Sequence, residues 1–552
     1  MEDRNTRTRT PRALVALTLA AALLGPSLAS TRGTAPAHAH AHPAAAGGIL
    51  RIADEGLSDL ASIDPPSPSA GDAQSNLVEG LVFGGLVRLD QNLRVQPNAA
   101  ASWTVGDGGK VYTFTLQPNL KWGDGTTVTA DDVVYSLTRG FDPAYASGGV
   151  SFYLSHILGG QDVTKGKAKT VRGLKAIGTN KIQITLDQPA AVILDELAYS
   201  VAYLVPRHQV QTSGKTWTEH AAALGPFIVK QWKHNQEIDL VPNPYYWRGK
   251  PKLAGVNVEF IQNTETAYNL YKTGAVDIMG LINFPGNHLK DVQGTPDLHT
   301  SAQLFTEFLP VNEHHKPFDN PLVRQAFSYA INRATITKLL NSRFLPANGI
   351  LPPGMPGYNK GLAGQVFDPA KAQALLAKAG YPGGKGLPKI TLNVDGGDND
   401  GQTKATALKE FWQKVLGVDV ALSQLEHTAY ISALTARSFD LAFIQWGADY
   451  PDPQDFLSLL FQSGASTNNG YYSSAVFDQL TQAADVAPHD SASRYRQYQQ
   501  AEQLAVSQVA GIVLDWGKGN VLIRPAVHGV QITALGGGAA LAAPNWADVT
   551  VQ

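Results

Sequence analysis

The sequence predicts an α/β protein with mixed sheets. Short stretches of alternating or continuous apolar residues, typical of strands, recur along the chain between helical stretches. Strands and helices alternate without a fixed period, which excludes a solenoid. The chain has 552 residues, 43% of them hydrophobic and 16% charged. This length suggests about two to four domains.

Charge and cysteine content exclude several classes of function. The formal net charge is −2, which gives no overall attraction to nucleic acid or to an anionic membrane. The chain has no cysteine, which rules out disulfides, thiolate metal sites, cysteine nucleophiles and lipid attachment through a thiol. We therefore expect no nucleic-acid partner and no lipoprotein.

The N-terminus predicts export. A basic start is followed by the apolar stretch Ala13–Leu24, the length of a signal-peptide core and too short to span a bilayer. Ser27-Leu28-Ala29 offers a cleavage site. We predict a signal peptide over 1–29 and a disordered tether over 30–47, with an uncleaved anchor as the alternative. The mature protein is expected in the periplasm or outside the cell.

Local patterns predict the elements of the first half. Residues 49–53 form a short strand, and 75–89 a helix that becomes a strand at Gly84-Gly85. The stretch 111–116 alternates apolar and polar residues, as a half-buried strand does. Thr129 at the N-cap and Asp132 at N3 predict a capped helix that ends near Gly140. Further expected elements are strands at 182–186, 227 onward, 237–241 and 274–278, and a helix at 264–272.

The second half contains the best helix signal. Asp319 or Asn320 caps a helix with Pro321 near N1, and a buried stripe follows. Asp368-Pro369 starts another helix in the same way, which ends at Gly380. We expect further helices at 403–416 and 490–508, and strands at 512–514 and 530–535.

The stretch 439–456 combines a rigid element with polar chemistry. Its apolar run Leu441–Ile444 predicts a buried strand that brings Trp446, Gly447 and Asp449 to a Pro-rich turn. A glycine there admits another backbone, and an exposed strand edge accepts one more strand. We interpret this stretch as the floor of a site for an extended ligand with a positive end. A core strand followed by a solvated acid is the alternative.

No catalytic motif is present. The chain lacks a GxSxG elbow, an HExxH helix and a phosphate loop. The acidic stretch 395–401 fails as a calcium loop, because Gly396 and Ala407 occupy positions that need ligands. We expect no enzyme activity, no cofactor and no metal.

Six stretches in order resemble the peptide/nickel-type (family 5) solute-binding proteins of ABC importers. They are 79–81 (EGL), 122–126 with 129–136 (WGDGT, TADDVVYS), 243–247 (NPYYW), 274–278 (GAVDI), 316–319 with 323–333 (KPFD, VRQAFSYAINR) and 446–450 (WGADY). The matches extend from about Gly48 to the C-terminus, and their order makes them specific.

The resemblance implies a two-lobed periplasmic-binding-protein fold of type II, in the large class with an extra subdomain and a hinge between the lobes. Lobe I would comprise 48–80, 205–300 and 515–552. The extra subdomain would be 81–204, and lobe II would be 301–514. The ligand would lie in the cleft, and the lobes would close over it.

The resemblance also implies site residues. Asp449 would pair with the ammonium of a peptide that lies as an added strand. Trp446 and Gly447 would flank the peptide backbone, and Tyr450 ends the same motif. From the opposite lobe, Gly71 and Asp72 would face the peptide.

Three positions depart from the family pattern. Phe443 stands where an oligopeptide binder has an arginine for peptide carboxylates, and His427 stands in place of a pocket tryptophan. In the segment where dipeptide binders have a carboxylate-binding arginine, Lys404 is the cation present. It is a candidate ligand residue, with a solvated helix position as the alternative.

Three functions follow from the sequence. The first is an extracytoplasmic receptor, expected to be a monomer, that binds oligopeptides and delivers them to ABC permease subunits. The second keeps the fold but binds a nickel chelate, an oligosaccharide or another solute. The third is a secreted hydrolase of small amides, which would need a nucleophile and a base in the cleft.

Overall fold

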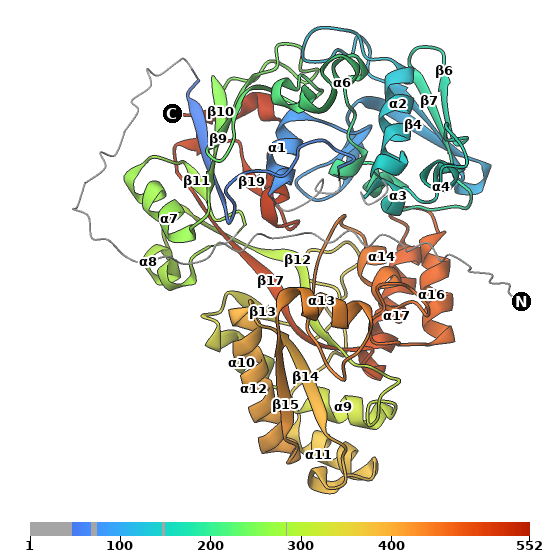
Figure 1. Ribbon diagram of the computed structural model, residues 1–552, viewed down its shortest axis with the longest axis vertical. Helices are drawn as coiled ribbons and strands as arrows, with labels where there is room; N and C mark the ends of the chain where they lie inside the picture. The colour runs from blue at the N-terminus through green and yellow to red at the C-terminus, as the bar shows by residue number, and fades with distance from the viewer. Residues whose placement is uncertain (1–46, 68–73, 146–148, 283) are drawn as a thin grey trace, which may run out of the picture. The chain divides into compact units, whose positions relative to one another are not determined.

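A nine-stranded mixed sheet runs through both lobes of this α/β fold (Figure 1). The computed structural model describes residues 47–67, 74–145, 149–282 and 284–552. The strand order is β16-β12-β17-β11-β1-β10-β9-β8, and β13 pairs with β17. In that order the bounds are Ile444–Gly447, Leu298–Pro310, Gly511–Ile523, Ile278–Met279, Ile49–Glu55, Gly255–Ile261, Glu237–Pro242 and Phe227–Lys233, with β13 at Phe344–Pro346.

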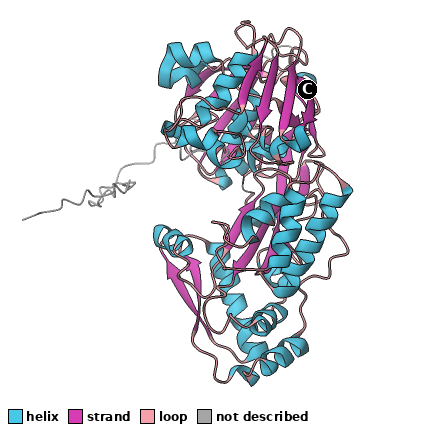
Figure 2. Ribbon diagram, turned by 90° about the vertical axis from the view of Figure 1, so that its right-hand side faces the viewer, coloured by secondary structure: helices cyan, strands magenta, loops and turns pink. Residues whose placement is uncertain are grey.

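The long antiparallel strands β12 and β17 are neighbours in this sheet. Their pairing extends from Leu298↔Leu522 to Pro310↔Gly511 and is irregular between Ala302 and Thr306. Strand β17 also pairs with β11, at Ile523 and Leu522, and β12 also pairs with β16, from Phe305 to Phe308. Figure 2 shows the strands continuing from the upper to the lower part of the view, with helices beside them. We call β12 and β17 the hinge strands.

The smaller sheets lie in the subdomain, in lobe II and near the C-terminus. The subdomain sheet has the order β4-β5-β7-β6, and the others are the pairs β2–β3, β14–β15, β18–β21 and β19–β20. Their bounds are β2 Val87–Leu89, β3 Val95–Pro97, β4 Ala100–Gly106, β5 Val111–Leu116, β6 Leu174–Ile177, β7 Lys181–Thr185, β14 Ile390–Asp395, β15 Val420–Leu425, β18 Val527–His528, β19 Gln531–Ile532, β20 Leu541–Ala542 and β21 Thr550–Val551.

The helices cover these sheets. They are α1 Ser75–Val82, α2 Ala130–Gly140, α3 Val150–Tyr153, α4 Gly160–Thr164, α5 Ile193–Glu196, α6 Arg207–Ser213, α7 Thr264–Thr273, α8 Leu289–Val292, α9 Pro321–Tyr329, α10 Arg333–Leu339, α11 Pro369–Lys378, α12 Asn399–Leu416, α13 His427–Thr435, α14 Pro453–Phe456, α15 Ser458–Phe461, α16 Ala475–Asp485 and α17 Ala492–Gln508. Among the described residues, no helix combines the length and apolar character needed to cross a bilayer.

Predictions based on local chemistry are confirmed. The Thr129 and Asp132 side chains form the reciprocal capping box of α2. The Asn320 side chain caps α9 by accepting a hydrogen bond from the Leu322 N–H, with Pro321 as the first helical residue. Strand β5 has the predicted bounds, and every second side chain of it is buried.

Some of the predicted strand bounds are wrong. Strand β17 continues well past the predicted 512–514, because β12 pairs along its length. The run from Leu441 is buried, but the strand begins only at Ile444. The expected strand at 274–278 shrinks to β11, because Gly274 ends α7 with a φ of 85°.

A buried ion cluster fastens the hinge strands to α12. The Lys404 ammonium lies 2.9 Å from Glu307 of β12 and 2.8 Å from Asp515 of β17. Its side chain is 1% exposed, so the alternative of a solvated helix position is wrong. Burial and the negative charge of Glu307 raise the pKa of Asp515, while Lys404 lowers it. The resulting pKa of Asp515 is about 7.

We expect Lys404→Met to lower the free energy of unfolding by about 3–5 kcal/mol, because two buried carboxylates lose their cation. The loss should be larger at about pH 8 than at about pH 5, because a raised folded-state pKa lets the acids take up protons as the pH falls. Denaturant unfolding at both pH values measures this.

The matched control is Lys409→Met on the same helix. Lys409 pairs with Asp419, and both side chains are solvent-exposed, at 40% and 73%. We expect a change below about 1 kcal/mol. Equal losses in the two variants would show that the buried cluster contributes nothing particular.

Candidate functional site

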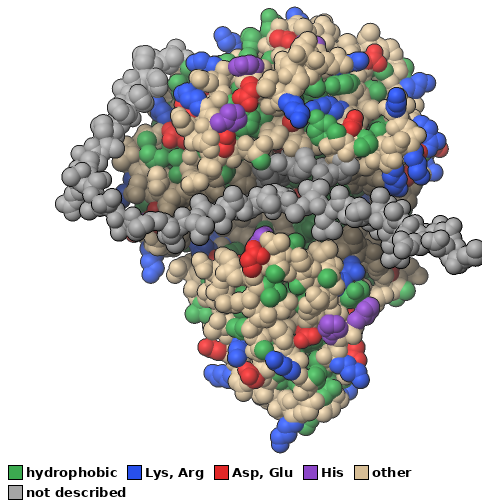
Figure 3. Space-filling view, viewed as in Figure 1, with side chains coloured by type: hydrophobic (Ala, Val, Ile, Leu, Met, Phe, Trp, Pro, Cys, Tyr) green, Lys and Arg blue, Asp and Glu red, His purple; other side chains and the backbone are tan. Residues whose placement is uncertain are grey.

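A cavity of about 430 Å³ opens between the subdomain, lobe I and the hinge strands. Its size is typical of pockets that hold a small ligand. The face drawn in Figure 3 is hollowed between its upper and lower parts, and charges of both signs are interspersed around the hollow. The hinge and lobe II contribute Gln303, Phe305, Gly447, Ala448, Asp449 and Tyr450 to the cavity lining.

Strand β16 presents an open edge beside this cavity. It pairs with β12 on one side and is the last strand of the sheet within the described chain. The Ala448 N–H donates to the Leu304 carbonyl at 2.7 Å, so the alternation of an antiparallel ladder points the backbone groups of Gln445 and Gly447 away from β12. A Cβ at Gly447 would meet only Phe305, at 4.0 Å. The edge can therefore receive another strand.

Asp449 lies directly after this edge. Its carboxylate accepts hydrogen bonds from Tyr153 at 2.6 Å and from Tyr199 at 3.3 Å, both from the subdomain. Among the described residues, no Lys, Arg or His nitrogen lies within 4.0 Å of it. Burial raises the pKa of Asp449, and the tyrosine hydroxyls oppose this by donating to the charged form. A cation at this position would remove the cost of burial.

Two further acids lie behind Asp449. Asp455 accepts from the Asp449 N–H at 3.1 Å, while its second oxygen is buried without a hydrogen-bond partner in the described chain. Burial and the nearby Asp449 charge raise the pKa of Asp455 well above its ordinary value. Glu196 of α5 is 3% exposed, and burial and Asp195 raise its pKa in the same way. Of Asp449, Asp455 and Glu196, Asp449 is the one that lines the cavity.

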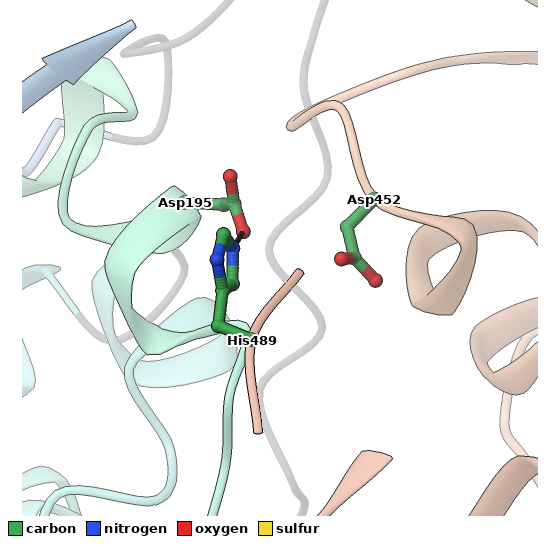
Figure 4. Close-up of side chains that lie close together, drawn as sticks. All are labelled: Asp195, Asp452 and His489. Atoms are coloured by element: carbon green, nitrogen blue, oxygen red, sulfur yellow. Dashed lines mark hydrogen bonds and ion pairs between the residues drawn. The ribbon is translucent and has the colours of Figure 1, made fainter. Parts of the chain in front are cut away.

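A second charged contact joins the subdomain to lobe II. Asp195 of α5 accepts from His489 Nε2 at 2.6 Å, as Figure 4 shows. Burial alone would lower the pKa of His489, but hydrogen bonds to Asp195 and Asp490 raise it to about 10. Asp195, Asp452 and His489 offer ligand atoms within 4.8 Å of one another. However, Arg494 already holds Asp452 through bonds of 2.5 and 2.8 Å, so a metal ion would compete with two ion pairs.

The predicted site residues divide into groups. Gly447, Asp449 and Tyr450 line the cavity. Trp446 does not; it packs on the lobe II core, and its ring N–H donates to Asp455 at 3.4 Å. Gly71 and Asp72 lie outside the described residues.

His427 and Lys404 are placed away from the cavity lining. His427 begins α13 with a 69% exposed side chain, 2.6 Å from Asp395. The Lys404 charge is used within the hinge cluster. Neither position supports the predicted contact with a ligand carboxylate or pocket group.

The tyrosines that contact Asp449 were not predicted from the sequence. Tyr153 and Tyr199 are 296 and 250 residues distant from it in sequence, and no local pattern marks them. Asp455 was within the stretch of interest, but its position in an Asp-Pro-rich turn gave no sign of burial.

The fold and the cavity define a two-lobed solute-binding protein. Residues 94–468 match the family described as bacterial extracellular solute-binding proteins, family 5 Middle. The match covers more than half of the chain, so the protein belongs to the family 5 bacterial extracellular solute-binding proteins.

Relatives in this family have several described ligands. The probable deoxycholate-binding periplasmic protein YgiS of Escherichia coli (strain K12) is 30% identical over 86% of this chain and 89% of the relative. The periplasmic oligopeptide-binding protein OppA of the same organism is 31% identical over 86% and 88%. The periplasmic murein peptide-binding protein MppA from that strain has the same identity and coverage.

Solved structures confirm the fold. The unliganded open form of the murein tripeptide-binding protein MppA has a TM-score of 0.78 and 28% identity, covering 92% of this chain and 99% of that chain. Another structure of the Escherichia coli protein MppA has a TM-score of 0.71 with the same coverage.

We expect His489→Gln to lower the free energy of unfolding by about 3 kcal/mol near pH 6, because Asp195 stays buried without its partner. The His489 pKa is raised to about 10, above the ordinary value of about 6.5. Its contribution is therefore complete below about pH 6.5 and disappears as the pH rises through about 10. Denaturant unfolding across this range measures the difference.

The matched control is His315→Gln. His315 lies 3.1 Å from Asp440 and is 46% exposed. We expect less than about 1 kcal/mol at any pH. A pH-independent loss in His489→Gln would contradict the ion-pair interpretation and indicate packing instead.

Proposed function

We propose that this protein is an extracytoplasmic receptor that binds extended peptides in the cleft and delivers them to the permease of an ABC importer. The observation that carries the proposal is the Asp449 carboxylate, which lines the cavity, has no cationic side chain within 4.0 Å in the described part of the chain, and lies next to the edge of β16 that is open among those residues. A peptide offers both matching features, an ammonium and a backbone with strand geometry.

The strand edge and the Asp449 carboxylate would have different roles in binding: the edge would supply affinity, and the carboxylate would set the register of the peptide. Hydrogen bonds from the free backbone groups of Gln445 and Gly447 would hold a peptide main chain whatever its side chains. The ammonium at Asp449 would fix where the peptide begins, through a charge-assisted bond. The tyrosines that now contact Asp449 would remain beside the ammonium or give way to it.

The names of relatives support this proposal. OppA and MppA are described as oligopeptide-binding and murein peptide-binding proteins, and the match extends over most of their length. Both are described as periplasmic, which agrees with the predicted signal peptide over 1–29. We propose export, binding as a monomer without catalysis, and recognition of the closed form by permease subunits.

A non-peptide solute is the second candidate. YgiS, with 30% identity, is described as probably deoxycholate-binding. Deoxycholate is a carboxylate without an ammonium, so it would not use Asp449. A nickel chelate or an oligosaccharide would also leave Asp449 without a role.

Native mass spectrometry of the purified mature protein, with fragmentation of the released ligand, tests whether that ligand is a peptide or a non-peptide solute. Co-purified peptides of narrow length range are the expected result. A steroid, a glycan or a metal chelate in their place would overturn the peptide proposal in favour of the second candidate.

We expect Asp449→Asn to weaken binding of peptides with a free ammonium by about 10- to 100-fold, the value of a charge-assisted hydrogen bond. Isothermal titration with one peptide and its N-acetylated form measures this. The acetylated form should bind both proteins equally. As the variant control, Asp419→Asn changes an acid that is 73% exposed. Equal loss for acetylated and free peptides would contradict the ammonium role.

We expect Gly447→Val to weaken all peptides by at least about tenfold, because the side chain would project into the cavity that Gly447 lines and would hinder close approach of a peptide backbone. The free energy of unfolding should change by less than about 1 kcal/mol, because valine suits a strand and the new Cβ has space. Titration and denaturant unfolding separate the two effects. Unchanged affinity would show that the peptide does not use this edge.

A further inference from the structure

The cavity that contains Asp449 also has a basic wall. Arg88 of β2 and Arg248, which follows the Tyr246-Trp247 pair after β9, both line it. The Arg248 guanidinium donates to the Pro544 carbonyl at 2.6 Å and lies 5.7 Å from the centre of the Trp247 ring. Strand β2 and the turn after β9 therefore each bring one guanidinium group to this cavity.

Neither arginine has an ion-pair partner in the described chain. The arginines with a carboxylate within 4.0 Å are Arg51, Arg139, Arg172, Arg324, Arg343 and Arg494. Arg88 donates to the Leu89 carbonyl at 3.2 Å, while its Nε is shielded from solvent and has no hydrogen-bond partner among the described residues. A shielded donor without a partner costs free energy that a bound acceptor would remove.

The nearest acid does not neutralise this pair. Asp90 also lines the cavity, but its carboxylate accepts from the N–H groups of Asn92 and Arg94 at 2.8 and 3.0 Å and from the Gln96 amide at 3.2 Å. Burial lowers the pKa of Arg88, and the positive charge of Arg248 lowers it further. The two guanidinium groups thus repel each other, and the charge of Asp90, which raises the pKa of Arg88, offsets this only in part.

We propose that Arg88 and Arg248 form an anion subsite that binds a carboxylate of the solute. The cavity then has opposite poles, with Asp449 for an ammonium and the two arginines for a carboxylate. For a peptide, whose carboxylate is the C-terminal one or an acidic side chain, the inference rests on the proposed function. Phe443 is apolar and the Lys404 charge is satisfied, so the positions expected from the family pattern do not supply this anchor.

The test uses alanine peptides of two to five residues in four forms: free, N-acetylated, C-amidated and blocked at both ends. Isothermal titration compares the native protein with Arg88→Gln, Arg248→Gln and the double variant. Arg94→Gln is the matched control, because Arg94 is an exposed arginine on the same β2–β3 hairpin. Denaturant unfolding of each variant confirms that it folds.

We expect C-amidation to weaken binding to the native protein by about 10- to 100-fold, as the loss of a charge-assisted hydrogen bond does. The ratio of acid to amide should fall to about 1 in the double variant and stay unchanged in Arg94→Gln, while the effect of N-acetylation persists in all of them. If peptides bind but acid and amide are equal in the native protein, the inference is overturned and the peptide proposal stands.

Titration with deoxycholate distinguishes failure of the anion subsite from failure of the peptide proposal. If no peptide binds, the peptide proposal fails, and deoxycholate is titrated instead. Loss of deoxycholate binding in the double variant, with retention in Arg94→Gln, would support the anion subsite for an acidic solute without an ammonium. Equal binding to all variants, or binding of neither acid by the native protein, would overturn the inference.

Discussion

Lys404 is held between acids of two different strands, and the geometry of the site depends on this arrangement. Glu307 and Asp515 belong to the two hinge strands, which both lobes share. Glu307 also accepts a hydrogen bond from Gln445 of β16 at 2.8 Å. Because a buried charge must keep all its partners, one cluster fixes the hinge strands, α12 and the edge strand together. The edge beside the cavity is therefore positioned from within the protein before any solute arrives.

Asp449 contributes a buried carboxylate to the cavity, and the buried acids Asp455 and Glu196 lie outside the cavity lining. Asp449, Asp455 and Glu196 all have raised pKa values, and burial is the largest cause in each case. Asp449 accepts from two tyrosine hydroxyls, and Asp455 accepts from a backbone N–H and from a tryptophan ring N–H, so all these donors are neutral. A ligand cation would compensate them more fully, because a charge-assisted pair is stronger than a neutral donor. Arg88 and Arg248 line the same cavity and bring positive charge to it.

Two contacts join the subdomain to lobe II beside the cavity. Tyr153 donates a hydrogen bond to Asp449, which lines the cavity, so a ligand cation must share or displace this contact. His489 Nε2 lies 2.6 Å from Asp195, which also lines the cavity, and His489 Nδ1 lies 3.2 Å from Asp490. Each contact therefore has one partner that a solute in the cavity can reach.

The sequence by itself determined the features with a local physical cause. The capping box of Thr129 and Asp132, the Asn320 cap before Pro321 and the alternation of β5 each depend on neighbouring residues. The same local patterns predicted that Gly447 and Asp449 lie at the end of a strand, and the family resemblance predicted the two lobes. Only the tertiary structure decided the length of β17, whose glycines form a strand because β12 pairs with them. It also decided the surroundings of Lys404, which lies 97 residues from Glu307, and of Asp449, which lies 296 residues from Tyr153. Contacts over such separations depend on packing of the whole chain, and no short pattern encodes them.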